Sequence, residues 1–195
     1  NYDEIIKDKN INAIYIATLN NTHFELIKKC SENNKNILCE KPFTLNYDEG
    51  REVYDYITKN RVIFYEGFAY RSHPQTKIIQ DIVQNNELGE IKNIQSSFGF
   101  KINKIKPDSR LFNKKLGGGA ILDVGCYPLS ILNLFYKDPD SYKFLNTKGN
   151  LTHTNVDDFA EAEIEINKKI RCQIKVSFKE NYQNKTIIEG QKGKL

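Results

Sequence analysis

An amine and a carboxylate stand side by side in Glu40-Lys41-Pro42, directly after the short apolar run Ile37-Leu38-Cys39. Because proline pushes the residue before it toward extended backbone, we expect Lys41 to lie at the end of a strand. There its ammonium could donate to a carbonyl or alkoxide oxygen, or take part in proton transfer. A solvated surface lysine and a Schiff-base lysine remain as alternative interpretations of the same residue.

A second chemical pair follows the three glycines Gly117-Gly118-Gly119. Asp123 and Tyr127 are four residues apart, so a helix would place both on one face. Such a pair could orient and protonate a hydroxyl or ketone oxygen. From spacing alone it is equally reasonable that Asp123 caps the helix and Tyr127 packs in the core. The glycines allow a tight turn or a close approach of the backbone to a ligand.

Short apolar runs alternate with helical patterns in the first third of the chain. The runs at 11–18, 37–39 and 62–65 predict strands, and the first is nearly continuous, as in a strand buried on both faces. Capping boxes predict that the intervening helices begin at Thr22 and Asn46. This order predicts parallel pairing, and ligands bind such sheets outside the carboxyl ends of the strands. The side chains expected there are those of Thr18, Glu40, Lys41 and Glu66.

The pattern changes near residue 70. A capping box that begins at Ser72, with Pro74 in the first turn, predicts a helix, and residues 129–135 predict another. Long runs at 91–100, 159–166, 170–178 and 186–188 predict an antiparallel sheet. We therefore expect an α/β unit over residues 1–69, followed by an α+β unit over residues 70–195 with a mostly antiparallel open sheet.

Composition argues against several classes of function. The 195 residues carry a net charge of +4 with acids and bases interleaved, so no nucleic-acid partner is expected. No apolar stretch approaches the roughly 18 residues of a membrane span, and the polar first residues do not resemble a signal peptide. The four cysteines lack metal-site spacing, so we expect no metal. Free thiols in a reducing cytoplasm are the simplest account of them.

Other charged residues have simpler interpretations. Asp157 and Asp158 are expected in a solvated loop before a strand. The basic residues that precede and follow Arg110 could attract a phosphorylated or nucleotide-linked sugar, or could form a plain solvated loop.

The two chemical segments together resemble the Gfo/Idh/MocA oxidoreductase family. The resemblance covers nearly the whole chain in order, through segments 17–23, 36–42, 70–74, 117–128 and 190–193. Within the family, the chain is most similar to the branch that contains dimeric dihydrodiol dehydrogenase and NADP-dependent xylose dehydrogenase. One departure is Leu19, where the family usually has proline, so the turn after the first strand is expected to be looser.

The resemblance implies a Rossmann domain that binds NAD or NADP, followed by a domain for substrate binding and dimerisation. It implies that Lys41 contacts the substrate hydroxyl and the nicotinamide region. Tyr127 stands at the acid/base position, which is often His in the family, and Asp123 stands at a position that helps hold the substrate. A homodimer or homotetramer is also implied. The positions on the cofactor side are Thr18, Asn20, His23, Glu40, Lys41 and Arg71.

The glycine-rich dinucleotide fingerprint, which belongs to the first βαβ unit of a Rossmann domain, does not occur in the chain. The chain also contains no Met, and it ends at Leu195 before the second sheet is expected to be complete. We therefore expect a fragment of a longer enzyme that lacks a βαβ unit of about 30 residues, or more, at its front.

A dehydrogenase that transfers a hydride between nicotinamide and a sugar, cyclitol or related hydroxyl or carbonyl substrate is the function that the resemblance implies. A non-catalytic regulator that senses sugar or cofactor on the same fold is one alternative. A glycosidase that retains its NAD is another. The joint presence of Lys41, Asp123 and Tyr127 favours the dehydrogenase. The sequence decides neither the substrate nor the choice between NAD and NADP.

Overall fold

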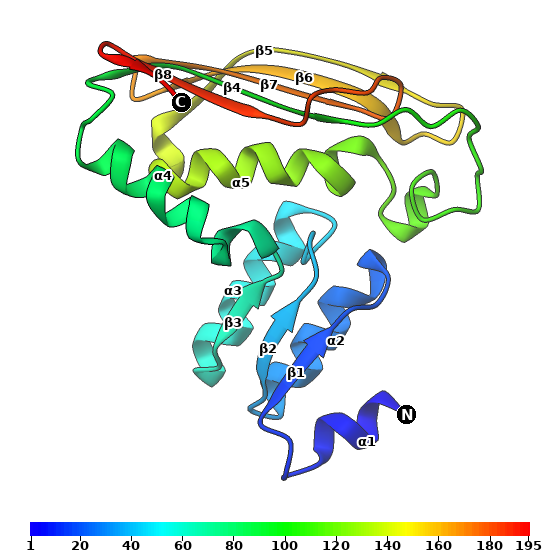
Figure 1. Ribbon diagram of the computed structural model, residues 1–195. Coiled ribbons are helices and arrows are strands. Elements are labelled where there is room, and N and C mark those ends of the chain that lie inside the picture. The colour runs from blue at the N-terminus through cyan, green and yellow to red at the C-terminus, as the bar shows by residue number, and fades with distance from the viewer. The chain divides into compact units, whose positions relative to one another are not determined.

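The structure is a computed structural model that describes all 195 residues, and it divides into two compact units (Figure 1). The first unit comprises Asn1–Phe68 together with Lys115–Gly117. The second unit comprises Ala69–Lys114 together with Gly118–Leu195. Each unit contains a hydrophobic core of its own.

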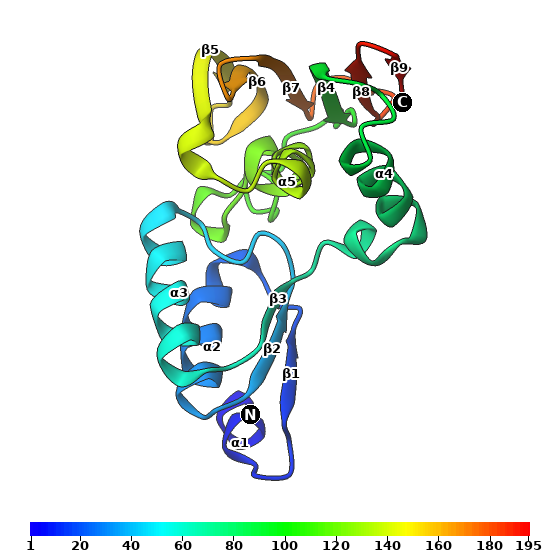
Figure 2. The same ribbon diagram turned by 90° about the vertical axis from the view of Figure 1, so that its left-hand side faces the viewer.

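Three parallel strands form the sheet of the first unit, in the order β1 (Ala13–Ile16), β2 (Asn36–Cys39) and β3 (Phe64–Glu66). The connecting helices α2 (Asn20–Glu32) and α3 (Tyr47–Asn60) both lie on one face of this sheet (Figure 2). The short helix α1 (Tyr2–Lys7) precedes β1. Parallel pairing through helical crossovers is thus confirmed, with β1 shorter than its apolar run.

The opposite face of this sheet is open. Tyr15, Leu38 and Tyr65 lie in register across the three strands, and all three are exposed. Ile16, Ile37 and Cys39 form the buried side with residues of α2 and α3. The prediction that the first strand is buried on both faces is therefore wrong, because only one layer of helices packs on the sheet.

The two crossover helices begin differently from one another. α3 begins as predicted, since the Asn46 side chain accepts from the Glu49 N–H at 2.9 Å and donates to the Glu49 carboxylate at 3.0 Å. α2 begins at Asn20, so Thr22 lies inside the first turn. The Thr22 hydroxyl donates back to the Leu19 carbonyl at 2.8 Å, and a side chain bonded in that direction does not cap the helix. The predicted capping box at Thr22 is therefore wrong.

Six strands form the sheet of the second unit. Only β4 pairs with β7 in parallel, and every other pair is antiparallel, so the predicted mostly antiparallel open sheet is confirmed. Apolar residues alternate along the central strands, where Ile94, Ile164 and Val176 are buried. The strand order is β5 (Tyr142–Leu151), β6 (Asp157–Ile166), β7 (Ile170–Ser177), β4 (Ile91–Gly99), β8 (Thr186–Gly190) and β9 (Gly193–Lys194).

The sequence pattern did not predict β5. Every residue after Tyr142 in this strand is exposed, so there is no alternation of apolar and polar residues to detect. The strand is held by a long antiparallel ladder to β6, with register shifts near Phe144 and Leu151. An edge strand that is stabilised mainly by backbone hydrogen bonds shows no clear pattern of apolar side chains in its sequence.

Two helices, α4 (Pro74–Gln84) and α5 (Cys126–Phe135), lie on the same face of the second sheet (Figure 1). α4 is capped by His73, whose Nδ1 accepts from the Gln75 N–H at 3.2 Å, so the predicted cap at Ser72 is displaced by one residue. A π-helical turn, Ile121–Gly125, leads directly into α5. The 3₁₀ helices are Ala69–Ser72, Lys114–Leu116 and Pro139–Ser141.

By length and apolar composition alone, the stretch Lys114–Phe135 could cross a membrane, so the expectation that no stretch approaches such a span is wrong. A single such stretch is weak evidence, because a core helix of a globular domain passes the same test. Here Val124, Pro128 and Leu132 are buried, and Val124 and Leu132 belong to the core formed with the strands of the second sheet.

We predict that Leu132→Ala destabilises the second unit by about 2–5 kcal/mol, because it leaves a cavity at a fully buried position of α5. The free energy of unfolding in urea measures this. Leu129→Ala on the same helix is the matched control, since Leu129 is 40% exposed and should cost much less. Equal losses in the two variants would contradict the packing described for α5.

Candidate functional site

Polar side chains gather at the carboxyl edge of the parallel sheet in the first unit. β1 and β2 end at Ile16 and Cys39, and Glu66 is the last residue of β3. Two backbone hydrogen bonds continue the pairing beyond the strand ends, from the Glu40 N–H to the Ile16 carbonyl at 2.9 Å and from the Gly67 N–H to the Cys39 carbonyl at 2.6 Å. The loops at this edge are therefore fixed by the sheet itself.

Lys41 lies in the loop directly after β2 and is partly buried, and its peptide bond to Pro42 is cis. Nearby, the Glu40 carboxylate accepts from the Tyr15 hydroxyl at 2.6 Å. The Glu66 carboxylate accepts from the Phe43 N–H at 3.2 Å. The edge thus combines one ammonium with two oriented carboxylates, a set that can both donate to and accept from hydroxyl groups.

His23 differs from the other predicted cofactor-side residues because its side chain is fully buried. Its Nδ1 lies 2.9 Å from the Pro42 carbonyl oxygen, and its Nε2 lies 3.2 Å from the Thr18 carbonyl oxygen. The imidazole therefore ties the loop after β1 to the loop after β2. This placement favours a role in holding the loops over the direct cofactor contact that the resemblance implies.

Asn20, at the start of α2, connects the same edge to Gly117, the first of the three consecutive glycines Gly117-Gly118-Gly119. Its Nδ2 donates to the Gly117 carbonyl at 3.2 Å. Gly117 has a φ of +75°, and a Cβ there would lie 2.3 Å from Leu45 Cδ2. The close approach of the backbone to Leu45 and Asn20 is the physical reason for a glycine at this position.

Cys39 ends β2 immediately before Glu40 and Lys41, but its thiol is not suited to act as a nucleophile. Burial, with a smaller effect of the nearby carboxylates of Glu66 and Glu40, raises the pKa of Cys39 to about 12. The thiol therefore stays protonated at neutral pH, and only a thiolate attacks efficiently.

In the second unit, Asp123 is buried and accepts a hydrogen bond from Arg110 Nη1 at 2.8 Å. It does not cap the helix, because the N-cap residue of the π-turn is Ala120. The alternative in which Asp123 acts as the helix cap is therefore wrong. The ion pair instead fixes the orientation of a buried carboxylate. Sequence reasoning placed Arg110 among loop residues, and only the fold brings it to Asp123.

Tyr127 is partly buried in a cluster of aromatic rings. Its ring centroid lies 5.3 Å from that of Phe98 and 6.3 Å from that of Tyr70. Ser130 connects this cluster, since its hydroxyl donates to the Tyr127 carbonyl at 3.0 Å and pairs with the Tyr70 hydroxyl at 2.6 Å. Arg71, a predicted cofactor-side residue, donates to the Ser130 carbonyl at 3.0 Å within the second unit.

The spacing of Asp123 and Tyr127 does not have the meaning that an α-helix would give it. Asp123 belongs to the π-turn, in which the Cys126 N–H bonds to the Ile121 carbonyl five residues back. Tyr127 belongs to α5. Because the π-turn widens the helical step, positions i and i+4 are not stacked as in a regular α-helix. π-turns of this kind are frequent at functional sites.

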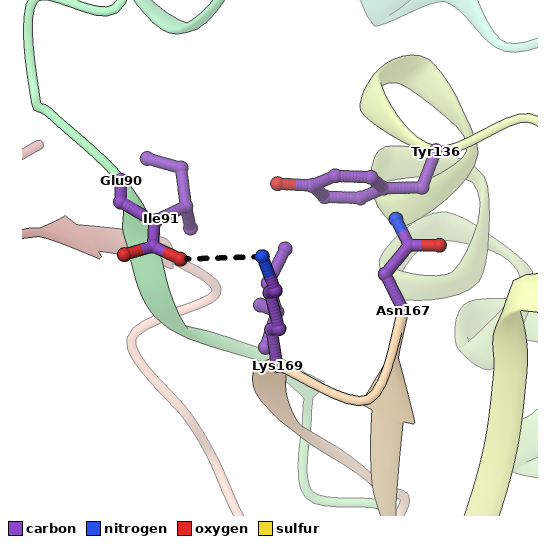
Figure 3. A pocket seen from close by; sticks show the side chains of 6 residues that line it. Glu90, Ile91, Tyr136, Asn167 and Lys169 are labelled. Carbon is purple, nitrogen blue, oxygen red and sulfur yellow. Dashed lines mark ion pairs between the residues drawn. The ribbon is translucent and has the colours of Figure 1, made fainter.

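A pocket of about 520 Å³ in the second unit lies among residues that the sequence did not single out (Figure 3). The Lys169 ammonium there lies 4.0 Å from the Glu90 carboxylate. None of the predicted site residues lines this pocket, which is formed by Glu90, Ile91, Tyr136, Asn167, Lys169 and Ile170. No group of three or more His, Cys, Asp or Glu side chains is arranged to hold a metal ion.

Two family models match the chain in order. The model described as an oxidoreductase family with an NAD-binding Rossmann fold matches residues 1–68. The model described as the GFO/IDH/MocA C-terminal domain matches residues 76–195. Together the two models cover nearly the whole chain.

Individual proteins show the same similarity. Trans-1,2-dihydrobenzene-1,2-diol dehydrogenase of Xenopus tropicalis is 31% identical over 98% of this chain and 57% of its own length. D-xylose 1-dehydrogenase (NADP(+)) 2 of Haloferax volcanii is 34% identical over 71% of this chain and 42% of its own length. The chain therefore covers 57% of the length of the first of these relatives and 42% of the second.

Among solved structures, the aldose-aldose oxidoreductase of Caulobacter crescentus, complexed with glycerol, superposes with a TM-score of 0.88. The alignment covers 99% of this chain and 58% of that one, at 20% sequence identity. This likeness shows a shared fold.

We predict that His23→Phe lowers the free energy of unfolding of the first unit by about 2–4 kcal/mol, because the imidazole that donates to a loop carbonyl and fits between the two loops is lost from a fully buried position. Urea unfolding measures the loss. Thr22→Val is the matched control at the adjacent position, and it should cost only about 1 kcal/mol because it removes hydroxyl contacts that are largely exposed. A His23→Phe variant as stable as Thr22→Val would show that the imidazole does not hold the two loops.

Proposed function

The chain belongs to the GFO/IDH/MocA oxidoreductase family, and we propose that it acts in an NAD(P)-dependent dehydrogenase on a hydroxyl or carbonyl group of a sugar, cyclitol or related molecule. The observation that carries this proposal is the gathering of Thr18, Glu40 and Lys41 at the carboxyl edge of the parallel sheet. Ligands of open parallel sheets bind outside this edge.

The chemistry of this edge fits a nicotinamide dinucleotide. Thr18, Asn20 and Glu40 carry hydroxyl, amide and carboxylate groups, which match ribose hydroxyls and a carboxamide as donors and acceptors. When bound, the cofactor supplies or accepts a hydride. We assign these three residues and Lys41 to the cofactor side. We assign His23 to holding the loops and Arg71 to a cofactor-side role, and both NAD and NADP remain candidate cofactors.

We assign to Lys41 the stabilisation of negative charge on the substrate oxygen. A hydroxyl group becomes a carbonyl only by losing its proton as the carbon gives up a hydride, so charge builds on the oxygen during the step. A fixed ammonium lowers the energy of that charge more than it lowers the energy of the neutral alcohol.

We assign to Tyr127 the transfer of the hydroxyl proton and to Asp123 the orientation of the substrate. The aromatic rings of Phe98 and Tyr70 restrict the Tyr127 side chain, which suits a proton donor that must keep one position. The bond from Arg110 holds the Asp123 carboxylate in a fixed direction, from which it can accept a hydrogen bond from a substrate hydroxyl.

The names of the relatives support a polyol-like substrate. The two relatives described above are named for D-xylose and for trans-1,2-dihydrobenzene-1,2-diol, which both carry oxygen on neighbouring carbons. An amine, a phenol and a carboxylate are suited to hold two adjacent hydroxyl groups while one of them reacts. We therefore propose a substrate with hydroxyl groups on adjacent carbons.

We also propose a cytoplasmic homodimer or homotetramer without nucleic-acid or membrane partners. The modest net charge and the four free cysteines support this setting. Between β6 and β7, Glu161, Glu163 and Glu165 pair in register with Lys175, Gln173 and Arg171, so this part of the sheet offers a second copy polar contacts. Light scattering at low and high salt tests this assembly, and a monomer at both salt concentrations would refute it.

The function is tested by cofactor binding to the natural protein that carries this chain, with this chain alone in parallel. Calorimetry with NAD and NADP comes first, followed by the absorbance of the reduced nicotinamide with a panel of sugars and polyols. Binding with turnover supports a dehydrogenase. Binding without turnover points to a sensor or to a glycosidase that retains NAD, and no binding refutes the dinucleotide assignment.

We predict that Lys41→Ala lowers kcat by about 100- to 1,000-fold while the protein stays folded, because the developing charge on the substrate oxygen loses its ammonium. Steady-state kinetics and a thermal melt measure the two properties. Lys59→Ala is the matched control, since Lys59 is exposed in the last turn of α3. Turnover within a few-fold of the parent protein in the Lys41 variant would refute the assignment.

A further inference from the structure

The helix that carries Asp123 and Tyr127 begins in a segment that has no side chain able to cap it. The residues before the π-turn are Gly117-Gly118-Gly119-Ala120, and none of them has a side-chain oxygen. The first N–H groups of any helix lack partners within the helix, and buried N–H groups without partners are costly. Water or a side chain from elsewhere in the chain can satisfy them.

Asp157, the first residue of β6, supplies that group. Its Oδ2 accepts from the Ile121 N–H at 2.7 Å. Asp157 lies 36 positions after Ile121 in the chain. A negative charge at the N-terminal end of a helix is also favoured by the helix dipole. The predicted solvated loop is therefore wrong for this residue.

Gly119 is shaped to receive the carboxylate. A Cβ on Gly119 would lie 2.3 Å from Asp157 Oδ1, far inside van der Waals contact. Gly119 also has a φ of +121°, a conformation that side chains strongly disfavour. Gly119, the last of the three glycines, thus leaves room for the Asp157 carboxylate, which takes the place of a local capping side chain.

The surroundings of Asp157 indicate an anchored carboxylate. Burial raises the pKa of Asp157, the hydrogen bonds from Ile121, from its own N–H and from Ala120 lower it, and the neighbouring charge of Asp158 raises it slightly. The carboxylate is thus held at a partly buried position, where the backbone N–H of Ile121 donates to it. Asp158, by contrast, accepts from Asn150 Nδ2 at 2.8 Å and has a separate partner.

Asp123 lies in the same turn but has a different partner from Asp157. A helix is usually capped by an acidic, amide or hydroxyl side chain on the residue just before its first turn, which here is Ala120. Asp157 accepts from the Ile121 N–H, and the Asp123 carboxylate accepts from Arg110. The position of the π-turn, and with it the placement of Asp123 and Tyr127, depends on where Asp157 holds Ile121.

We propose that Asp157 is a positioning residue, whose carboxylate fixes the start of the π-turn and thereby aligns Asp123 and Tyr127 for the reaction. It touches neither substrate nor cofactor in this role. The catalytic part of this inference rests on the proposed function of those two residues, whereas the structural part does not.

Hydrogen exchange over residues 118–128, followed by mass spectrometry, tests the structural part. Asp157→Ala should accelerate exchange of this segment about tenfold or more, because its first amides lose their acceptor. Asp158→Asn is the matched control and should leave exchange of the segment within twofold of the parent protein. Unchanged exchange in Asp157→Ala would overturn the inference.

Steady-state kinetics of the natural protein test the catalytic part. Asp157→Ala should lower kcat about 10- to 100-fold with the KM for the cofactor within twofold, since small displacements of reacting groups are costly. Asp157→Asn should recover part of the loss, because its amide oxygen still accepts from one N–H. Faster exchange with an unchanged kcat would overturn the link to the reaction.

Two further outcomes are distinguishable. If Asp157→Ala does not fold, Asp157→Asn replaces it, since the neutral amide weakens the contact with the Ile121 N–H and should accelerate exchange in the same segment to a smaller extent. If the parent protein shows no turnover on any substrate, the proposed function falls together with the catalytic role. The exchange result then still decides whether Asp157 fixes the turn.

Discussion

A helix that follows a run of glycines has no local side chain to cap its first N–H groups. In the second unit a carboxylate from a distant strand takes that role. Asp157 bonds to Ile121 at the start of the π-turn, and Gly119 leaves room for it. Asp123, in the same turn, pairs with Arg110. The direction of the Asp123 carboxylate and the position of Tyr127 both follow from where that helix begins.

In the first unit, too, a contact between segments that are distant in the sequence holds the edge of the sheet. Parallel strands bring three loops to one edge, but they do not fix the distance between the loops. His23 supplies that distance, since its two ring nitrogens contact the carbonyls of Thr18 and Pro42. Lys41 lies immediately before Pro42, so its position depends on a buried imidazole that does not have to touch any ligand.

In both units, therefore, the side chains proposed to react and the side chains that fix their positions are different residues. Lys41, Asp123 and Tyr127 carry the ammonium, carboxylate and phenol, while His23 and Asp157 use their polar atoms on the backbone. Catalytic groups need their geometry fixed before the substrate arrives, and supporting side chains that hydrogen-bond to the backbone fix it. Family membership agrees with this arrangement, but it does not specify the substrate.

The sequence by itself determined the features that depend on neighbouring residues. Alternating apolar runs predicted the parallel strands and the main antiparallel strands, and Asn46 with Glu49 predicted the start of α3. Only the tertiary structure decided what depends on distant partners. The exposed strand β5, the burial of His23 and the contact of Asp157 with Ile121 fall in this class. Periodicity and capping act within a few residues, whereas these contacts exist only once the chain has folded segments tens of residues apart against each other.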